Sequence, residues 1–235
     1  MPSESEGTGG RRASDRGRYG RLSRERVLAS ALEVVDRDGL SGLSMRKLGA
    51  ELGVEAMALY RYARGKGALL DGLVEAFCLE LEGDLAVASG KGATDDWAQE
   101  LHRVALATYQ VALRHPHVVP LLATRLLSTP LARRPAAVLR SDERVLALLH
   151  DAGFENGRTV AVHRAFTAWL LGYLLVELRA MDDEPDEPDP AFRLGLHRIS
   201  AQELPRLRTV APSMAERGGP AGLSAGLEAL LDDYR

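Results

Sequence analysis

The stretch SMRKLGAELGVEAMALYRY, residues 44–62, consists of two short amphipathic segments joined at a glycine. Ser44 is suited to cap a first helix, because a serine hydroxyl accepts a hydrogen bond from a free N–H of the first turn. Gly49 leaves room for a second helix to cross closely, and Gly53 tolerates the positive φ of a tight turn. Four apolar residues flank the turn at the spacing of buried contacts: Leu48, Leu52, Val54 and Leu59. Together these features predict a helix-turn-helix unit.

Helical patterns continue on both sides of this stretch. Ser23 is a good N-cap for an earlier helix that should end at Gly39, and another helix should begin at Lys66. Further helical patterns cover about 95–115, 118–128, 136–152, 158–181, a short segment with a Ser200/Glu203 capping box, and 223–234. Because we find no alternating strand pattern, we expect an all-α fold of nine or ten helices.

The chain divides into three parts. Residues 1–21 are rich in Gly, Ser and Arg and lack apolar periodicity, so we expect a disordered basic arm. Residues 22–80 should form the helix-turn-helix domain, and residues 92–235 a second helical domain, with the boundary near 80–92.

The composition is typical of soluble globular proteins, with 46% hydrophobic and 27% charged residues in a chain of 235. No uninterrupted apolar run reaches the roughly 18–20 residues of a membrane span. The N-terminus lacks the apolar core of a secretory signal peptide. Cys78 is the single cysteine, so no internal disulfide can form. We therefore expect a cytoplasmic protein that contacts no membrane.

Charge is distributed unevenly along the chain. Residues 1–70 hold 13 Arg and Lys against 9 Asp and Glu, whereas residues 71–235 hold 17 against 24. A basic N-terminal part on an acidic body indicates that the N-terminal part meets a polyanion.

Motifs of catalysis are missing from the sequence. We find no nucleophile elbow, no Gly-rich phosphate loop, no zinc-ligand spacing and no paired catalytic carboxylates. His115 and His117 lack a third clustered ligand, which argues against a metal site. We expect no enzymatic activity, no cofactor and no metal.

Residues 39–75, GLSGLSMRKLGAELGVEAMALYRYARGKGALLDGLVE, resemble the DNA-binding head of the TetR (tetracycline-repressor) family of bacterial transcription regulators. The shared features are the capping Ser44, the LGV turn, the LYRY end of the second helix of the motif, and Lys66. The resemblance covers about residues 22–78. It implies a three-helix DNA-binding domain followed by a helical ligand-binding and dimerisation domain. It further implies a homodimeric regulator, expected to be a repressor, which a small-molecule effector releases from a palindromic operator.

The resemblance also implies which residues contact double-stranded DNA. They are Ser44, Met45, Arg46, Glu55, Ala56, Met57, Ala58, Tyr60, Arg61, Tyr62 and Lys66. Lys66 would hold a phosphate at the start of its helix, where the helix dipole favours an anion. Ser44 would touch a phosphate as well as cap its helix, whereas helix packing is an open alternative for Tyr60.

Base recognition should depend on few groups. Residues 56–58, Ala-Met-Ala, offer bases apolar contact but no bidentate hydrogen bonds. Specificity should therefore rest on Arg46 and Arg61. Whether the five arginines of the N-terminal arm contact DNA or only keep the chain soluble stays open.

The apolar pattern of residues 158–181 extends over two faces of a helix, so this helix should be buried on two sides. The resemblance implies a four-helix dimer interface formed by this helix, the last helix and their copies. The implied interface residues are Val162, Tyr173, Leu174, Leu223, Leu227, Leu230 and Leu231.

The resemblance also places an effector pocket in the second domain. Candidates by position are Trp97, Leu101, Tyr109, Leu113, Leu122, Arg125, Leu126, His163, Phe166 and Trp169. Core packing is the alternative for each of them. Arg125 is suited to an anionic ligand group, or to an ion pair with an acid of the chain. Continuing the resemblance without gaps puts Glu82 where the tetracycline repressor has a ligand-binding histidine, which argues against tetracycline.

Two other functions stay open at this point. The chain could be a helical small-molecule-binding protein or an activator, and in either case its helix-turn-helix would make contacts other than those of a repressor. Binding that weakens steeply with salt would favour DNA, because phosphate contacts release counterions.

Overall fold

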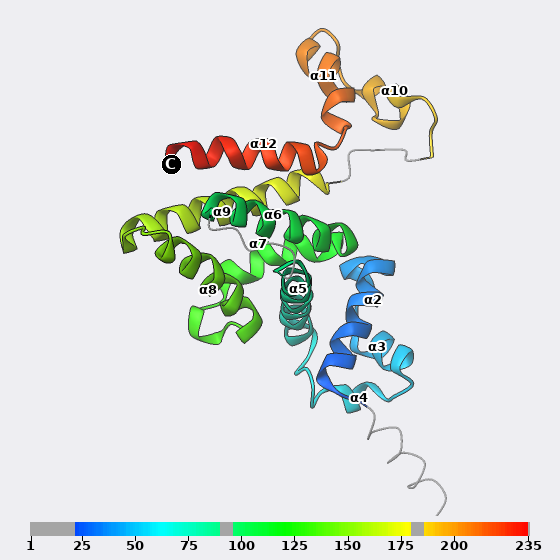
Figure 1. The fold of residues 1–235 in the computed structure, drawn as a ribbon. Coiled ribbons are helices and arrows are strands. Elements are labelled where there is room, and N and C mark those ends of the chain that lie inside the picture. The colour runs from blue at the N-terminus through cyan, green and yellow to red at the C-terminus, as the bar shows by residue number, and fades with distance from the viewer. Residues whose placement is uncertain (1–21, 90–95, 180–185, 235) are drawn as a thin grey trace, which may run out of the picture. The chain divides into compact units, whose positions relative to one another are not determined.

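A computed structural model describes residues 22–89, 96–179 and 186–234 of the chain. Within these ranges the regular structure consists of eleven α-helices and four short 3-10 stretches, with no strand (Figure 1). The predicted all-α fold is confirmed. The predicted disordered arm lies outside the described residues.

The chain forms two compact units, which are described separately. Of the described residues, the first unit combines 22–89 with 114–143, and the second combines 96–113 with 144–179 and 186–234. These are units of packing, and the functional domains expected from the sequence stay a prediction.

The first unit is built around the packing of α2 on α5. Its elements are α2 (Arg24–Gly42), α3 (Met45–Leu52), α4 (Ala56–Leu59), α5 (Lys66–Ser89), η1 (Pro116–Val118), α7 (Val119–Ser128), η2 (Leu131–Arg133) and the first part of α8 (Ala136–Asp151). The two helices approach closely at Gly72, where a Cβ atom would lie 2.3 Å from Leu28 Cδ2. Buried apolar side chains fill the contact: Val27, Val35, Leu69, Leu73 and Phe77.

Both predicted ends of α2 are present. The Ser23 hydroxyl accepts a hydrogen bond from the Arg26 N–H at 3.2 Å. At the other end Gly39 has φ 70° and ψ 174°, which interrupts the helix before its last residues. Its φ is positive as predicted, but its ψ is extended rather than that of a left-handed helical cap.

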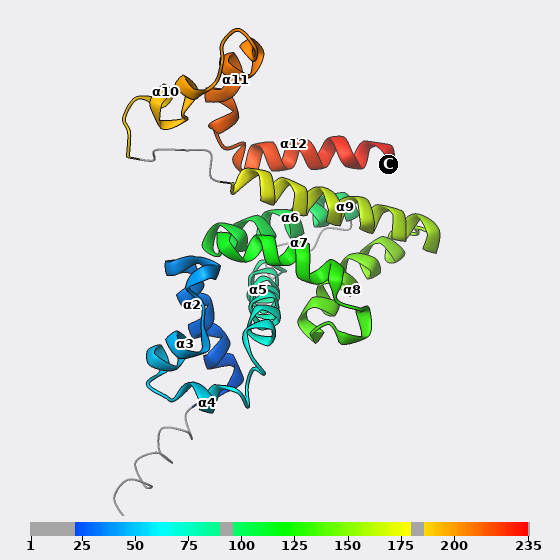
Figure 2. The same ribbon diagram turned by 180° about the vertical axis from the view of Figure 1, so that it is seen from behind.

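The second unit contains the long helix α9 and the C-terminal helix α12, which lie side by side in both views (Figures 1 and 2). Its elements are most of α6 (Trp97–Arg114), the end of α8, α9 (Asn156–Glu177), α10 (Pro190–Arg193), η3 (Leu196–Arg198), α11 (Pro205–Ala215), α12 (Gly219–Leu231) and η4 (Asp232–Tyr234).

Glycines of α12 receive the aromatic side chains of α9. A Cβ atom on Gly226 would lie 3.1 Å from Trp169 Cζ2, and one on Gly222 would lie 3.1 Å from the Tyr173 hydroxyl. The Glu177 carboxylate accepts hydrogen bonds from the N–H groups that precede and open α12, at 3.1 and 2.8 Å. The small residues of α12 therefore set how closely these two helices pack.

Several predicted boundaries differ from the structure. The second helix of the helix-turn-helix is α-helical only over Ala56–Leu59, and turns follow to Tyr62. Ser200 accepts a hydrogen bond from the Glu203 N–H at 3.2 Å, but it closes a turn, and α11 begins only at Pro205. The one helix beyond the predicted nine or ten in the described ranges is α10, which the sequence analysis did not anticipate.

One described helix, α9, is long and apolar enough to cross a membrane by length and composition. Arg164 interrupts the apolar sequence of α9, so the length of its uninterrupted apolar run gave no sign of a membrane span. Since the core helix of a soluble protein meets the same criterion, and α9 packs along α12, this property is weak evidence for a membrane span.

Candidate nucleic-acid interface

The crossing of α3 and α4 is fixed by their glycines and by the cap of α3. The Ser44 hydroxyl accepts a hydrogen bond from the Lys47 N–H at 3.2 Å. A Cβ atom on Gly49 would lie 2.8 Å from the Val54 carbonyl oxygen, so a larger residue there would force the helices apart. Gly53 has φ 66° and ψ 32°, the left-handed conformation that glycine adopts without strain. The predicted helix-turn-helix geometry is present.

The outer face of α4 is exposed and partly apolar. Leu59 is fully buried beneath it, whereas Met57 is 74% exposed and Tyr60 is 44% exposed. Ala56 and Ala58 are half-buried beside Met57. A large exposed apolar side chain at the tip of a short helix suits contact with another molecule.

Polar and charged candidates surround this tip. Ser44, Arg46 and Glu55 are exposed, and Met45 is half-buried. The Arg61 guanidinium lies over the Tyr62 ring, 4.9 Å from its centre, a stacked arrangement that restrains the arginine.

Tyr62 has a structural role that the sequence analysis missed. Its hydroxyl donates a hydrogen bond of 2.6 Å to the backbone carbonyl of Leu22. This bond ties the residue before the Ser23 cap of α2 to the end of the helix-turn-helix. Tyr60 is therefore the tyrosine whose exposed side chain is better placed for DNA contact.

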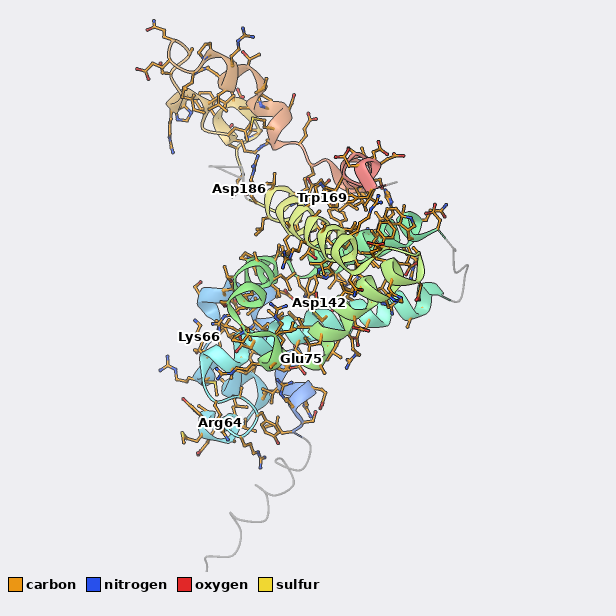
Figure 3. All side chains as sticks on the ribbon, turned by 90° about the vertical axis from the view of Figure 1, so that its left-hand side faces the viewer. Arg64, Lys66, Glu75, Asp142, Trp169 and Asp186 are labelled. Carbon is orange, nitrogen blue, oxygen red and sulfur yellow. The ribbon has the colours of Figure 1, made fainter. Side chains whose placement is uncertain are left out.

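Lys66 lies where the sequence analysis placed it, as the first residue of α5 (Figure 3). Its Nζ donates to the Leu40 carbonyl at 3.4 Å, in an exposed position. The N–H groups of the first helical turn and the ammonium group together suit a phosphate. Arg64 is an exposed neighbour of this helix start.

Ion pairs hold the back of the helix-turn-helix rather than its outer face. Asp38 binds Lys47 at 2.8 Å, and Arg37 pairs with both Asp38 and Glu51. The hydrogen bond from Lys47 is the main cause that lowers the pKa of Asp38. These groups stabilise the packing of α3 against α2.

His115 occupies a second charged cluster of the first unit. Its Nδ1 lies 2.7 Å from Asp36 Oδ2, and its Nε2 lies 2.7 Å from Glu80 Oε2. His117 is exposed. Within residues 22–89, 96–179 and 186–234, no three His, Cys, Asp or Glu side chains are arranged to hold a metal ion. His115 therefore connects α2 to α5, a role that its spacing from His117 did not suggest.

The candidate pocket residues belong to different units. Trp97, Leu101, Tyr109, Leu113, His163, Phe166 and Trp169 lie in the second unit, and Leu122, Arg125 and Leu126 lie in the first. Leu101, Tyr109, Leu122 and Phe166 are buried. Trp169 stacks on Tyr173 at 5.7 Å, and Arg125 Nη1 pairs with Asp71 Oδ1 at 3.1 Å. His163 is half-buried and Leu113 is at the margin of exposure.

Each unit has a cavity of its own that includes one predicted residue. A cavity of about 580 Å³ in the second unit is lined by Trp97, Ala152, Gly153, Phe154, Glu155, Arg158 and Tyr234. A cavity of about 260 Å³ in the first unit is lined by Arg24, Ala68, Asp71, Val74, Arg125, Thr129, Arg133, Arg134 and Pro135. Arg133 and Arg134 were not predicted as site residues, although two adjacent arginines before Pro135 are a signal visible in the sequence.

Comparison with known proteins decides what this fold belongs to. The profile for bacterial regulatory proteins of the tetR family matches residues 27–73, and that for the tetracyclin repressor-like C-terminal domain matches residues 89–232. The chain belongs to the TetR family. The resemblance inferred from the helix-turn-helix is thereby confirmed, and the family is one of transcription regulators rather than enzymes.

Curated TetR-family relatives match different lengths of the chain. It is 31% identical over 175 residues to the HTH-type transcriptional repressor DrrR1 of Streptomyces coeruleorubidus, over 74% of this chain and 60% of that protein. It is 35% identical over 159 residues to an HTH-type transcriptional regulator of Saccharopolyspora erythraea, and this match covers 66% of this chain and 61% of that protein. The chain thus spans about 60% of the length of these two. The class A tetracycline repressor of Escherichia coli matches at 29% identity over 90% of both chains.

Solved TetR-family structures share the fold over nearly the whole chain. A possible TetR-family regulator from Streptomyces coelicolor superposes with a TM-score of 0.70 at 28% identity, over 91% of this chain and 98% of that one. The TetR-family protein ActR of the same species, solved in complex with actinorhodin, matches with a TM-score of 0.65 at 20% identity, over 90% and 96%. The second likeness concerns the fold alone.

Proposed function

We propose that this TetR-family chain is a cytoplasmic transcriptional repressor that binds a palindromic operator as a homodimer and leaves it when a small molecule binds. The observation that carries the proposal is the exposed face of α4, held on a helix-turn-helix whose turn geometry is complete. In this motif the N-terminal residues of the second helix face the bases of the major groove.

The contacts divide into two kinds. Arg61 and Arg46 read base edges, and Met57 gives apolar contact, for instance to a thymine methyl group. Ser44, Tyr60 and Lys66 hold phosphates, which fix the orientation of the protein without reading sequence. The remaining candidates, Met45, Glu55, Ala56, Ala58 and Tyr62, shape the face or support it.

Homodimerisation would use surfaces of α9 and α12 that packing inside the chain leaves uncovered. Of the interface residues inferred from the resemblance, five are fully buried within one chain: Val162, Leu174, Leu223, Leu227 and Leu231. They are therefore packed inside the chain, and a partner helix would meet other residues of α9 and α12. Tyr173 and Leu230 are half-buried.

Exposed residues of α9 form a stripe with a spacing of four, and α12 has a similar one. They are Val160, Arg164, Ala168, Gly172 and Val176 on α9, and Ala221, Ala225 and Ala229 on α12. The small members of these stripes, Ala168 and Gly172 on α9 and the three alanines of α12, would let helices of two copies approach closely. We propose these stripes as the dimer surface, which gives a palindromic site a two-fold symmetric partner.

The effector we propose is not tetracycline. Glu82, at the position where the tetracycline repressor has its ligand-binding histidine, is held by a bidentate ion pair with Arg140, at 2.7 and 2.9 Å. A carboxylate fixed in this way supplies neither the ring nitrogen nor the donor of a histidine. The chemistry of the effector stays open, and the effector must bind the released conformation more tightly than the DNA-bound one.

DNA binding is tested on the sequence upstream of the chain's own gene and on sites selected from random duplexes. We expect a saturable shift in gel electrophoresis on a palindrome, with an affinity that falls steeply as salt rises. A chain that selects no sequence from the random pool would contradict the proposal. A salt-independent affinity would instead indicate contacts other than phosphates.

A further inference from the structure

The cavity of the first unit is lined by four arginines from separate elements. Arg24 opens α2, Arg125 lies near the end of α7, and Arg133 and Arg134 lie at η2 and just beyond it. Asp71 of α5 is the single acid among the lining residues. Such a concentration of guanidinium groups around a hollow gives it a positive potential.

Three of these arginines already have carboxylate partners. Arg24 pairs with Glu75 at 2.7 Å, Arg125 with Asp71 at 3.1 Å, and Arg134 with Asp142 at 3.4 Å. These pairs hold the guanidinium groups in place around the cavity.

Arg133 is the fourth arginine, and none of the three acids that pair with the other arginines compensates its positive charge. Arg133 is exposed and lines the cavity, and its guanidinium group has no hydrogen-bond or ion-pair partner among the residues that the structure describes. Its backbone N–H donates to the Pro130 carbonyl at 2.8 Å. The four arginines with their three acids leave one positive charge without compensation. A bound anion would supply that compensation, because a guanidinium binds a carboxylate or a phosphate through two parallel hydrogen bonds.

Other groups at the cavity are also suited to an anion. Thr129 is among the lining residues, and its hydroxyl is a group that can donate a hydrogen bond. Pro135 lines it immediately before α8, whose N-terminal end carries partial positive charge and free N–H groups. The Arg134 side chain is held by a hydrogen bond of 3.1 Å from its Nε to the Thr129 carbonyl.

The size of the cavity limits the occupant. About 260 Å³ is below the roughly 300–1,000 Å³ of pockets for drug-sized ligands. Arg134 and Arg125, with side chains 20% and 33% exposed, are too enclosed to lie along the backbone of a DNA duplex. A small organic anion fits both the volume and the charge.

We propose that this cavity binds a small organic anion through a carboxylate or phosphate group, which forms an ion pair with the guanidinium of Arg133. The site joins α2, α5 and α7, so an occupant would act on the helices that support the helix-turn-helix. Anion binding is measured without DNA, so its failure can be distinguished from a failure of the proposed repressor function.

The test is calorimetric titration of the full chain at low ionic strength with inorganic phosphate and, separately, with citrate. We expect saturable binding at one site per chain for at least one probe, and the better probe identifies the anionic group. Arg133→Ala should weaken binding at least fivefold, and Arg133→Lys should keep more of it. The matched control is Arg140→Ala, because Arg140 pairs with Glu82 outside the cavity and its loss should leave the affinity unchanged.

Three outcomes would overturn the proposal. In the first, neither probe binds saturably. In the second, Arg133→Ala and Arg140→Ala weaken anion binding equally, which would indicate general charge attraction. In the third, Arg133→Ala weakens DNA binding in buffer free of both probes but leaves anion binding intact, which would make Arg133 a DNA-phosphate contact. Because the Arg133 side chain is exposed, the variant should keep the wild-type melting temperature, and this is checked first.

Discussion

Met57 on α4 and Arg61 in the turns just after α4 present different chemistry to the solvent. Met57 has no hydrogen-bond donor for a base, whereas Arg61 has a fork of donors restrained over the Tyr62 ring. In the proposed DNA complex, the exposed apolar side chain would contribute contact area, and discrimination between bases would fall to arginine. This division follows from side-chain chemistry and from the positions of Met57 on α4 and of Arg61 in the turns that follow it.

Arg61→Ala should relax sequence preference. Loss of a bidentate contact to a guanine should reduce discrimination at that base pair by about 1–3 kcal/mol. Competition binding with single-base variants of the selected operator measures this. Arg37→Ala is the matched control, because Arg37 pairs with Glu51 behind the reading face. If Arg61→Ala and Arg37→Ala preserve the same base preferences, Arg61 does not read bases.

Cys78 on α5 gives a residue-scale prediction for pH. Burial raises the pKa of its thiol to about 12, although a hydrogen bond with Ser141 acts in the opposite direction. The unfolded chain ionises this thiol near its ordinary value of about 8.5. The stabilisation from the neutral buried thiol is therefore complete below that pH and is lost as pH rises toward 12.

We expect unfolding midpoints in urea to fall above about pH 9, and Cys78→Ala to remove part of that fall. Native protein at pH 8 should react with a thiol reagent only as fast as it opens, and rapid stoichiometric labelling would contradict the buried position.

At the scale of elements, the crossing of α3 and α4 depends on the absence of a side chain at Gly49. The contact that a Cβ atom would meet is a backbone carbonyl, which cannot move aside as a flexible side chain can. Leu48 and Leu59 are fully buried and hold this helix pair together, so Met57 at the tip can stay exposed without loss of the core contact.

Gly49→Ala should therefore destabilise the chain by about 1–3 kcal/mol, the usual range for overpacking. Gly83→Ala on α5 is the matched control. A Cβ atom there meets nothing within 4 Å, and alanine should stabilise the helix by roughly 0.5–1 kcal/mol. Urea unfolding followed by circular dichroism measures both. A neutral Gly49→Ala would mean that the turn relaxes at little energetic cost.

At the scale of the whole molecule, the proposed dimer depends on which faces of α9 and α12 are left after these helices have packed on each other. Their apolar pattern exceeds what one contact needs. The contact inside the chain uses the leucines of α12, and the uncovered stripe of α9 ends in Val176, which is 56% exposed. A charge placed there would have to be buried in a dimer without a partner.

Val176→Asp should shift the chain from dimer to monomer. Val87→Asp is the matched control, because Val87 is 79% exposed on α5 and lies outside the proposed stripe. Light scattering after size-exclusion chromatography gives the mass of each variant. A wild-type monomer, or a Val176→Asp dimer as stable as that of Val87→Asp, would contradict the assignment of this surface.

Local sequence was enough to predict the helix-turn-helix. Its cap, its two glycines and its buried leucines lie within 19 residues, and each has a local steric or hydrogen-bonding reason. The all-α class followed from periodicity in the same way. The helix after Ser200 was misplaced because a serine hydroxyl closes a turn with the same hydrogen bond with which it caps a helix.

The sequence by itself therefore determined the fold class and the family, and it predicted the face proposed to meet DNA. Only the tertiary structure decided which distant charges meet: His115 with Asp36 and Glu80, and Arg125 with Asp71. It also decided which apolar residues of α9 and α12 are used inside the chain and which stay exposed. The reason is physical: capping and helical periodicity act over a few residues, whereas ion pairs and burial depend on the packing of segments far apart in sequence.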